Sequence, residues 1–356
     1  MRKTADIVIY RKPNRHFAFV GLTRRANGEI LVVFREGAGH VDPEGRILLM
    51  RSSDEGHTWS GPEVAVDTEL DDRDPSIKTL PDGRVVVNYF SSKCTAPWSE
   101  EQIKNWIGPG AYPLGKNNWN AEVQRIGLRF SDDGGRKWGE EVQLKRDDEK
   151  KLKMKYVAVS GSVCALADGR LVLPVYGQEE GSQVSAVFLI RSTDGGKNWG
   201  GLERVAFDPE GNTPFCEPSM LTLSDGHLLC HLRTTGAKTD PGAVWQTESS
   251  DNGRTWTQPH KLLLWGYRQS LTLLDSGDVL SVYGCRRYPM GVRGAISHDG
   301  GRTWDPCGEF AIRWDGAHHD LGYPAAVPLG GSRAFVAYYL NTADDPFSYI
   351  CGSWIE

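Results

Sequence analysis

Apolar residues along this chain fall into short runs that are separated by turn sequences. Typical runs are residues 46–50, 186–190 and 243–247, which are rich in Val, Leu, Ile or aromatic side chains. Runs of this length between Gly, Asp and Ser clusters indicate β-strands, whereas helices need longer segments with a period of 3.6 residues. The pattern therefore predicts an all-β protein.

A motif of the form Ser-x-Asp-x-Gly-x-x-Trp occurs five times along the chain, each time directly after one of these predicted strands. The five copies are Ser52 to Trp59, Ser131 to Trp138, Ser192 to Trp199, Ser249 to Trp256 and Ser297 to Trp304. Ser and Asp can bond their own nearby backbone, Gly can take a positive φ, and Trp can bury a large apolar face. Because the same turn recurs in every unit, we interpret it as a structural fastener rather than as a catalytic element.

A second turn, Asp-Gly or a relative, recurs between these boxes, so each unit contains two hairpins. Two hairpins make a four-stranded antiparallel sheet, and such sheets repeated around an axis form a β-propeller. We predict six blades, at residues 17–66, 72–145, 156–207, 216–265, 268–312 and 321–354. The run at residues 6–10 is expected to complete the last blade and close the ring, which leaves no open sheet edge.

Composition narrows the classes of function. A closed ring has no independent halves, so we expect one domain over residues 1–356. The net charge of −5 without basic clusters argues against a nucleic-acid partner, and no apolar run is long enough to span a membrane. No secretory signal is recognised, and seven irregularly spaced cysteines fit free thiols, so we expect a cytoplasmic protein. We expect no cofactor, and the oligomeric state stays open.

The longest stretch outside the repeats is residues 91–120, inside the second blade. It is rich in aromatic residues: Trp98, Trp106, Tyr112 and Trp119. Insertions of this length are usually functional lids or rim loops.

Residues that differ from one repeat to the next are the candidates for a specific site. Three arginines are the first such candidates. Arg11 follows the opening strand, Arg233 ends a strand that begins near Glu217, and Arg286 lies in the fifth blade, with Arg287 and Arg293 as competitors. Converging guanidinium groups offer forked donors that suit a carboxylate. An acidic oligosaccharide or glycoconjugate is therefore the expected partner.

Together, these boxes and arginines resemble the sialidase (neuraminidase) superfamily of six-bladed propellers over essentially the whole chain. The resemblance implies that Arg11, Arg233 and Arg286 hold the carboxylate of a sialic acid, although Lys12 replaces the family's Ile. It also implies that Tyr323 is the nucleophile and that Glu217 activates it. A neutral tyrosine suits this substrate because the anomeric carbon already bears a carboxylate that would repel a charged nucleophile.

The general acid is harder to assign, because the loop at residues 34–45 has no Asp at the place where the family carries one. Asp42, His40 and Asp74 are the three candidates, and a histidine pKa near neutrality suits acid–base work. Arg35 in the same loop and His319 in the last blade are further substrate-binding candidates. The pair His318 and His319 lacks a Cys or carboxylate at ligand spacing, so we predict no metal.

Two other functions remain open. His40, His319, Tyr323 and the arginines equally suit β-elimination from a uronic acid, as in a rhamnose-glucuronate lyase, where arginine neutralises the carboxylate and His or Tyr removes the α-proton. A non-catalytic glycan-binding propeller is the third possibility. The primary prediction is an exo-acting glycosidase of the sialidase type.

Overall fold

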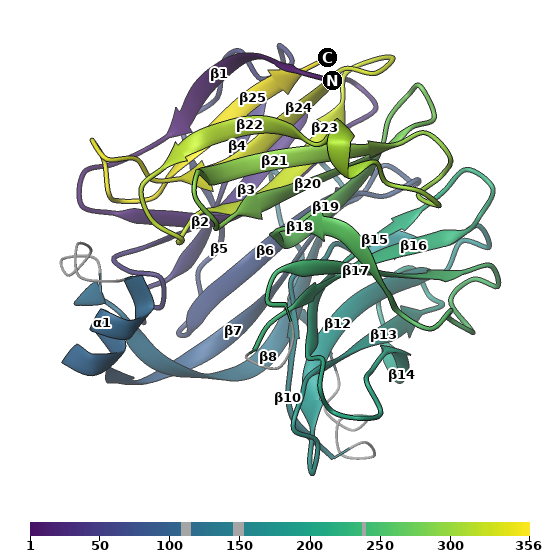
Figure 1. Cartoon of the computed structure of the whole chain (residues 1–356), viewed down its shortest axis with the longest axis horizontal. Coiled ribbons are helices and arrows are strands. Elements are labelled where there is room, and N and C mark those ends of the chain that lie inside the picture. The colour runs from purple at the N-terminus through teal and green to yellow at the C-terminus, as the bar shows by residue number, and fades with distance from the viewer. Residues whose placement is uncertain (108–114, 145–152, 237–239) are drawn as a thin grey trace.

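Six antiparallel sheets surround a central axis in the computed structural model (Figure 1), which describes residues 1–107, 115–144, 153–236 and 240–356. This confirms the predicted six-bladed β-propeller, and each sheet begins and ends within a few residues of the predicted blade. In the first five blades the strands run in chain order with the first strand nearest the axis, whereas the sixth blade runs from the inner β23 (Gly322–Pro328) outward to β1 (Lys3–Tyr10).

The first three blades occupy the N-terminal half of the chain. The first holds β2 (His16–Arg24), β3 (Ile30–Gly37), β4 (Arg46–Ser52) and β5 (Glu63–Val66). The second holds β6 (Asp71–Thr79), β7 (Val85–Pro97), β8 (Trp119–Ser131) and β9 (Val142–Gln143). The third holds β10 (Met154–Val159), β12 (Leu171–Glu179), β13 (Ala186–Ser192) and β14 (Gly200–Ala206), with the short β11 (Cys164–Ala165) beside β12.

The other three blades complete the ring. The fourth holds β15 (Phe215–Thr222), β16 (Leu228–Thr234), β17 (Ala243–Ser249) and β18 (His260–Trp265). The fifth holds β19 (Tyr267–Leu273), β20 (Val279–Cys285), β21 (Met290–Ser297) and β22 (Phe310–Gly316), with the 3-10 turn η1 (Pro306–Gly308) between the last two. The sixth holds β23 (Gly322–Pro328), β24 (Ala334–Leu340), β25 (Tyr349–Ile355) and β1 (Lys3–Tyr10).

The ring closes where the first strand of the chain meets the last. β1 pairs antiparallel with β25, with Ile7 opposite Gly352, and forms the outer strand of the sixth blade. The two termini lie side by side (Figure 1), and the Arg2 amide donates to the Glu356 carbonyl at 2.8 Å. As predicted, this strand covers an edge that would otherwise be open.

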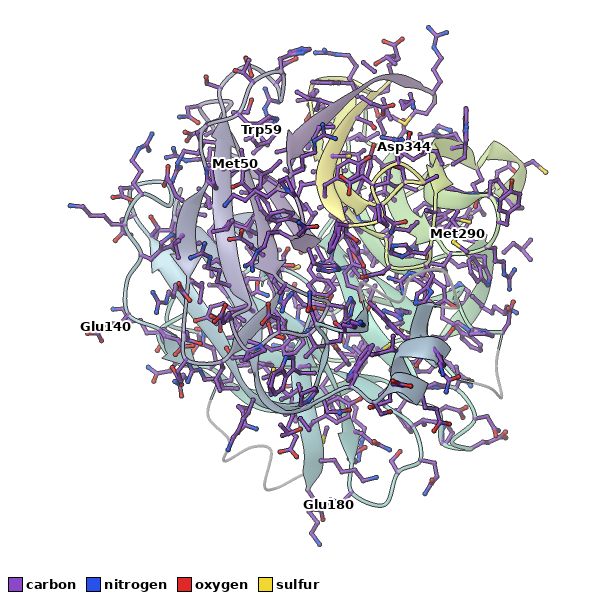
Figure 2. The ribbon with its side chains drawn as sticks, turned by 90° about the vertical axis from the view of Figure 1, so that its left-hand side faces the viewer. Met50, Trp59, Glu140, Glu180, Met290 and Asp344 are labelled. Carbon is purple, nitrogen blue, oxygen red and sulfur yellow. The ribbon has the colours of Figure 1, made fainter. Side chains whose placement is uncertain are left out.

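The hydrophobic core is divided among the spaces between neighbouring blades. Alternate residues of a strand face opposite sides of its sheet. In β3, Ile30 and Val32 therefore pack toward the sixth blade, whereas Leu31 and Val33 pack toward the second. Side chains fill the molecule between its sheets (Figure 2).

The boxes are turns between the third and fourth strands of a blade, as their repetition predicted. In the first box, Ser52 Oγ donates to Asp54 at 2.8 Å and accepts from the Gly56 amide at 2.9 Å, while Asp54 accepts from the Thr58 amide at 2.9 Å. Trp59 lies 5.8 Å from the ring of Phe335 in the sixth blade. The box thus closes its own turn and packs against the preceding blade.

The insertion in the second blade consists of the extended ends of β7 and β8 and the helix α1 (Glu100–Ile107) (Figure 1). Tyr112 lies outside the described residues. No helix in the described part of the chain is long and apolar enough to cross a membrane. All seven cysteines are free thiols.

Candidate active site

Five of the six inner strands carry a bulge at an equivalent position, and the bulged residue has a positive φ. These residues are Phe19, Asp74, Glu217, Arg268 and Tyr323, with φ between 41° and 60°. A positive φ is uncommon for a non-glycine residue, and a bulge re-aims the side chain relative to a regular strand. Proline follows three of these residues (Asp74, Glu217 and Tyr323), and its missing N–H removes it from the ladder.

Four of these five residues line a cavity of about 250 Å³ at one end of the axis; Arg268 lies behind it. The lining consists of charged and aromatic side chains: Phe19, His40, Arg73, Asp74, Phe90, Trp106, Tyr176, Glu217, Arg233, Arg286, His319, Asp320 and Tyr323. A concave site with converging titratable groups has the properties expected of an active site.

Tyr323, Glu217 and Arg233 form a closed hydrogen-bonded group in this cavity. The Tyr323 hydroxyl donates to Glu217 Oε1 at 2.7 Å and accepts from Arg233 Nη1 at 2.8 Å, and the same nitrogen donates to Glu217 Oε2 at 2.5 Å. Tyr323 comes from the sixth blade, whereas Glu217 and Arg233 come from β15 and β16 of the fourth. A phenol bonded to a carboxylate is the arrangement needed to remove its proton as it attacks.

The charges of this group are set by burial and by Arg233. Burial alone would raise the pKa of Glu217, but the charge and hydrogen bond of Arg233, together with the Tyr323 hydroxyl, hold it below its ordinary value. Burial and the nearby Glu217 carboxylate raise the pKa of Tyr323 well above its ordinary value. At neutral pH the pair is therefore an ionised base beside a neutral phenol.

Asp74 has the opposite character to Glu217. Burial, with a smaller contribution from Glu217, raises the pKa of Asp74 to about 7, although Arg73 opposes the shift. Its side chain makes no hydrogen bond to another described residue. A carboxyl group that keeps its proton up to neutral pH beside an ionised Glu217 gives the cavity one acid and one base.

Arg286 presents a cation that no carboxylate neutralises within the described residues. Its guanidinium donates to the Leu321 carbonyl at 3.2 Å and to the Tyr339 hydroxyl at 3.4 Å, and it lies over the rings of Tyr267 and Tyr323. Arg73, by contrast, is paired with Asp71 at 3.1 Å. An anionic ligand in this cavity would therefore meet an uncompensated charge at Arg286.

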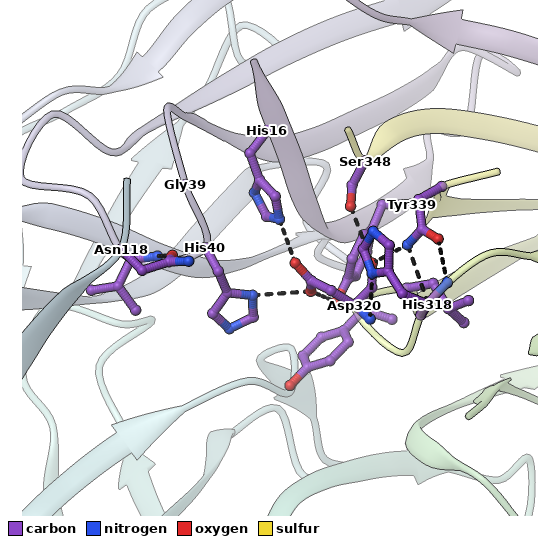
Figure 3. A network of polar contacts seen from close by, with 12 residues as sticks. His16, Gly39, His40, Asn118, His318, Asp320, Tyr339 and Ser348 are labelled. Carbon is purple, nitrogen blue, oxygen red and sulfur yellow. Dashed lines mark hydrogen bonds and ion pairs between the residues drawn. The ribbon is translucent and has the colours of Figure 1, made fainter. Parts of the chain in front are cut away.

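A carboxylate shared by two imidazoles forms one wall of the cavity (Figure 3). Asp320 contacts His16 Nε2 at 2.7 Å and His40 Nδ1 at 3.0 Å, and it accepts from the Tyr339 hydroxyl at 3.0 Å. Burial lowers the pKa of His40 to about 4 despite the opposing charge of Asp320. His40 is therefore neutral at pH 7, and a proton on Nδ1 for the bond to Asp320 leaves Nε2 as an acceptor.

The same three side chains bring potential metal ligands within 4.8 Å of one another. Metal-bound histidines almost always donate their other ring N–H to a partner. His16 Nδ1 is buried and has none within the described residues. This donor set therefore fits a hydrogen-bonded carboxylate better than a metal centre.

The insertion contributes an aromatic wall. Trp106 of α1 lies 5.0 Å from the ring of His40, 5.7 Å from that of His319 and 5.1 Å from that of Trp98, measured between centroids. Trp106 thus brings the insertion to the lining of the cavity.

Comparison with known proteins supplies the family. Residues 111–335 match the BNR repeat-like domain family. The chain belongs to this family. No curated protein matches the BNR-repeat chain.

Solved structures share the fold of this BNR-repeat propeller. A Dyadobacter fermentans protein of unknown function is 26% identical, with a TM-score of 0.83 and coverage of 99% of this chain and 98% of its own. A leech intramolecular trans-sialidase is 14% identical, with a TM-score of 0.68 and coverage of 99% and 70%. A Penicillium chrysogenum alpha-L-arabinanase is 14% identical, with a TM-score of 0.69 and coverage of 100% and 99%. The chain is thus a sialidase-like BNR propeller in its architecture.

Two predicted binding residues lie outside the cavity of the BNR-repeat propeller. Arg11 follows β1, which is the outer strand of the sixth blade, and it lines a separate depression with Arg313 and Asp345. Arg35 is fully buried in β3, where it is paired with Asp71 at 2.6 Å. Neither side chain can join Arg233 around a ligand, so both assignments are corrected.

The contacts of the remaining candidates show which of them line the cavity and which do not. Asp42 accepts from the Ala38 and Glu44 amides and does not line the cavity, so it is a turn residue. Arg287 is paired with Asp240 and Arg293 with Glu309, which leaves Arg286 as the cavity arginine of the three. Six other candidates line the cavity together, namely His40, Asp74, Glu217, Arg233, His319 and Tyr323.

Sequence reasoning missed Asp320, Arg73 and Arg268. Asp320 lies within the loop His318 to Tyr323, but only the fold brings it to His16 and His40. Arg268 occupies the same bulge position as Glu217 and Tyr323, so alignment of the inner strands on the bulge would have found it.

Proposed function

We propose that the protein is an exo-acting glycosidase of the sialidase type, which removes a terminal sialic acid or a related carboxylated sugar. The observation that carries this proposal is the contact of the Tyr323 hydroxyl with Glu217 at 2.7 Å and with Arg233 at 2.8 Å. A buried tyrosine that shares its hydroxyl with a base and a cation is equipped as a nucleophile.

In the first step, Tyr323 Oη attacks the anomeric carbon and Glu217 accepts its proton. The glycosidic bond breaks, and Asp74 gives its proton to the leaving oxygen. In the second step, ionised Asp74 takes a proton from water as the water attacks the anomeric carbon. Tyr323 then leaves and regains the proton from Glu217. A neutral nucleophile avoids repulsion by the carboxylate on the anomeric carbon.

The substrate carboxylate is assigned to Arg286 and Arg233. Arg286 has no carboxylate partner within the described residues, and Arg233 lies at the hydroxyl of the proposed nucleophile. Two guanidinium groups from neighbouring blades offer forked donors to one carboxylate. The BNR family membership and the fold shared with sialidases support the same proposal.

Hydrolysis of an aryl α-sialoside tests this function. We expect release of the aglycone by the wild-type protein and its loss in Tyr323→Phe, which removes only the hydroxyl. Cys307→Ser, at an exposed position outside the cavity, is the matched control and is expected to keep wild-type turnover. Full turnover by Tyr323→Phe would contradict the role of Tyr323.

A second function is supported by His40, whose bond to Asp320 fits a neutral imidazole with Nε2 as an acceptor. In a uronic-acid lyase, such a base would take the α-proton, the electron pair would form a carbon–carbon double bond, and the glycosidic oxygen would leave with a proton from Asp74. Arg286 would neutralise the carboxylate during this step.

Ultraviolet absorbance distinguishes the two reactions, because elimination creates an unsaturated uronate and hydrolysis creates no double bond. The lyase proposal predicts rising absorbance with a rhamnose-glucuronate oligosaccharide and its loss in His40→Ala. Sugar release without new absorbance would contradict it.

A further inference from the structure

A second and larger cavity lies at the opposite end of the axis. Its volume is about 600 Å³, and it is formed by the parts of the inner strands that follow the bulges, such as Gly21 to Arg24 and Ser76 to Thr79. Arg268 separates it from the proposed active site, because its guanidinium spans the axis and bonds Ser76 Oγ and Ser160 Oγ at 3.1 Å each.

The charge of this cavity differs from that of the whole molecule. Four cationic side chains line it, namely Arg24, Arg25, Lys78 and Arg268, and its described lining contains no Asp or Glu. The chain itself carries a net charge of −5. A concave surface lined by one sign of charge raises the local concentration of oppositely charged ligands.

Three of the four cations lack an acidic partner. Arg25 is neutralised by Glu29 at 2.6 Å. Within the described residues, no carboxylate lies within ion-pair distance of Arg24, Lys78 or Arg268. Arg24 donates to the Pro328 carbonyl at 3.1 Å and keeps a buried Nε without a partner, and Arg268 is 7% exposed. The charges of Arg24 and Lys78 are therefore available to an anion, whereas all three guanidinium nitrogens of Arg268 are bonded to oxygens of Val20, Ser76 and Ser160.

Hydroxyl groups also line this cavity. Ser162 and Ser270 line the cavity and make no side-chain hydrogen bond to another described residue. The cavity is large enough for a monosaccharide, since ligand pockets commonly measure about 300–1,000 Å³. The lining thus offers charge to an anionic group and hydrogen bonds to a hydroxylated body.

We propose that this axial cavity binds a small sugar phosphate. Lys78 and Arg24, which both line the cavity, supply positive charge for the phosphate, and lysine commonly binds phosphate as a compact point charge. Ser162 and Ser270 bond the sugar hydroxyls. The site is separate from the proposed glycosidase centre and does not depend on that activity.

Isothermal titration with glucose 6-phosphate at constant ionic strength tests the proposal. We expect saturable binding with a Kd in the millimolar range or below, and no binding of glucose. The double variant Lys78→Gln/Arg24→Gln is expected to weaken binding about tenfold or more, because it removes two charged hydrogen-bond donors to the phosphate.

Two further variants locate the bound anion. Lys197→Gln removes one positive charge from a box turn outside the cavity, and Arg286→Gln alters the other cavity; both are expected to keep wild-type affinity. Failure of the wild type to bind would overturn the proposal. Loss of binding in Arg286→Gln with retention in the double variant would overturn it too. Equal affinity for inorganic phosphate would overturn the role of the hydroxyls.

Discussion

The outer turns of this propeller repeat both backbone and side chains from blade to blade, whereas the inner bulges repeat only the backbone. Each box repeats the same bonds, so that Ser249 to Asp251 in the fourth blade reproduces Ser52 to Asp54 in the first. The bulges repeat a backbone shape but present different side chains, among them Asp74, Glu217, Arg268 and Tyr323. One backbone position, varied from blade to blade, thus brings the proposed acid, base and nucleophile together near a common axis.

The largest predicted effect lies at a bulge. Glu217→Gln keeps the shape of the side chain but removes the proposed base, so we expect kcat/KM to fall about a hundredfold to ten-thousandfold. Aryl sialoside turnover measures it. Glu203→Gln, which alters an exposed pair with Arg191 in the third blade, is the matched control. Equal activity of both variants would contradict a catalytic role for Glu217 at the bulge.

The second prediction concerns Asp74 and is tested by the dependence of the hydrolysis rate on the leaving group and on pH. Asp74→Asn should slow substrates with poor leaving groups about a hundredfold and spare activated aryl glycosides, because only the former need a proton. Since the pKa of Asp74 is raised to about 7, wild-type activity should fall as the pH rises through that value. The same fall in Asp74→Asn would assign it to another group.

The same residue makes a prediction for stability. The pKa of Asp74 is raised from 3.8 to about 7 on folding, so the stabilisation it provides is complete below pH 3.8 and is lost as the pH rises to about 7. Asp74→Asn should therefore gain stability relative to the wild type over this range. A melting-temperature difference that is flat from pH 4 to pH 8 would contradict the shift.

Arg268 is a bulge residue that we expect to stabilise the fold. It bonds Val20, Ser76 and Ser160 in the first three blades. Arg268→Lys cannot satisfy all of these acceptors, so we expect a loss of about 2 kcal/mol in unfolding free energy. Arg302→Lys, in an outer box turn, is the control. Denaturant unfolding with equal midpoints for both would refute this role.

The smallest effect is expected in a box. Ser249 Oγ donates to Asp251 and accepts from the Gly253 amide, so Ser249→Ala should lose about 1 kcal/mol of unfolding free energy with unchanged kcat. Ser250→Ala removes an exposed hydroxyl from the same turn and should be neutral. A fall in kcat without a fall in stability would give the box a direct part in catalysis.

Local patterns were enough to predict the ring. The boxes and Asp-Gly turns mark the hairpins and so give the order of the strands, and side chains along a strand alternate between the two faces of its sheet. Glu217, Arg233 and Tyr323 followed from the resemblance to sialidases. Arg11 and Arg35 were misassigned because a linear sequence does not reveal whether an arginine near a strand end faces the axis.

Asp320 could not be predicted for a related reason. Its partners His16 and His40 lie some 300 residues away in the chain, at separations of 304 and 280 positions. No local pattern records such a contact, and only ring closure brings these segments together.

The most direct test of Tyr323 as the nucleophile is to trap the sugar on its side chain. A difluorinated sialic acid, which slows release of the glycosyl–enzyme, is incubated with the protein, and peptides are analysed by mass spectrometry. We expect an adduct on Tyr323 that is absent from Tyr323→Phe. Turnover of an aryl sialoside with the adduct on another residue would contradict it.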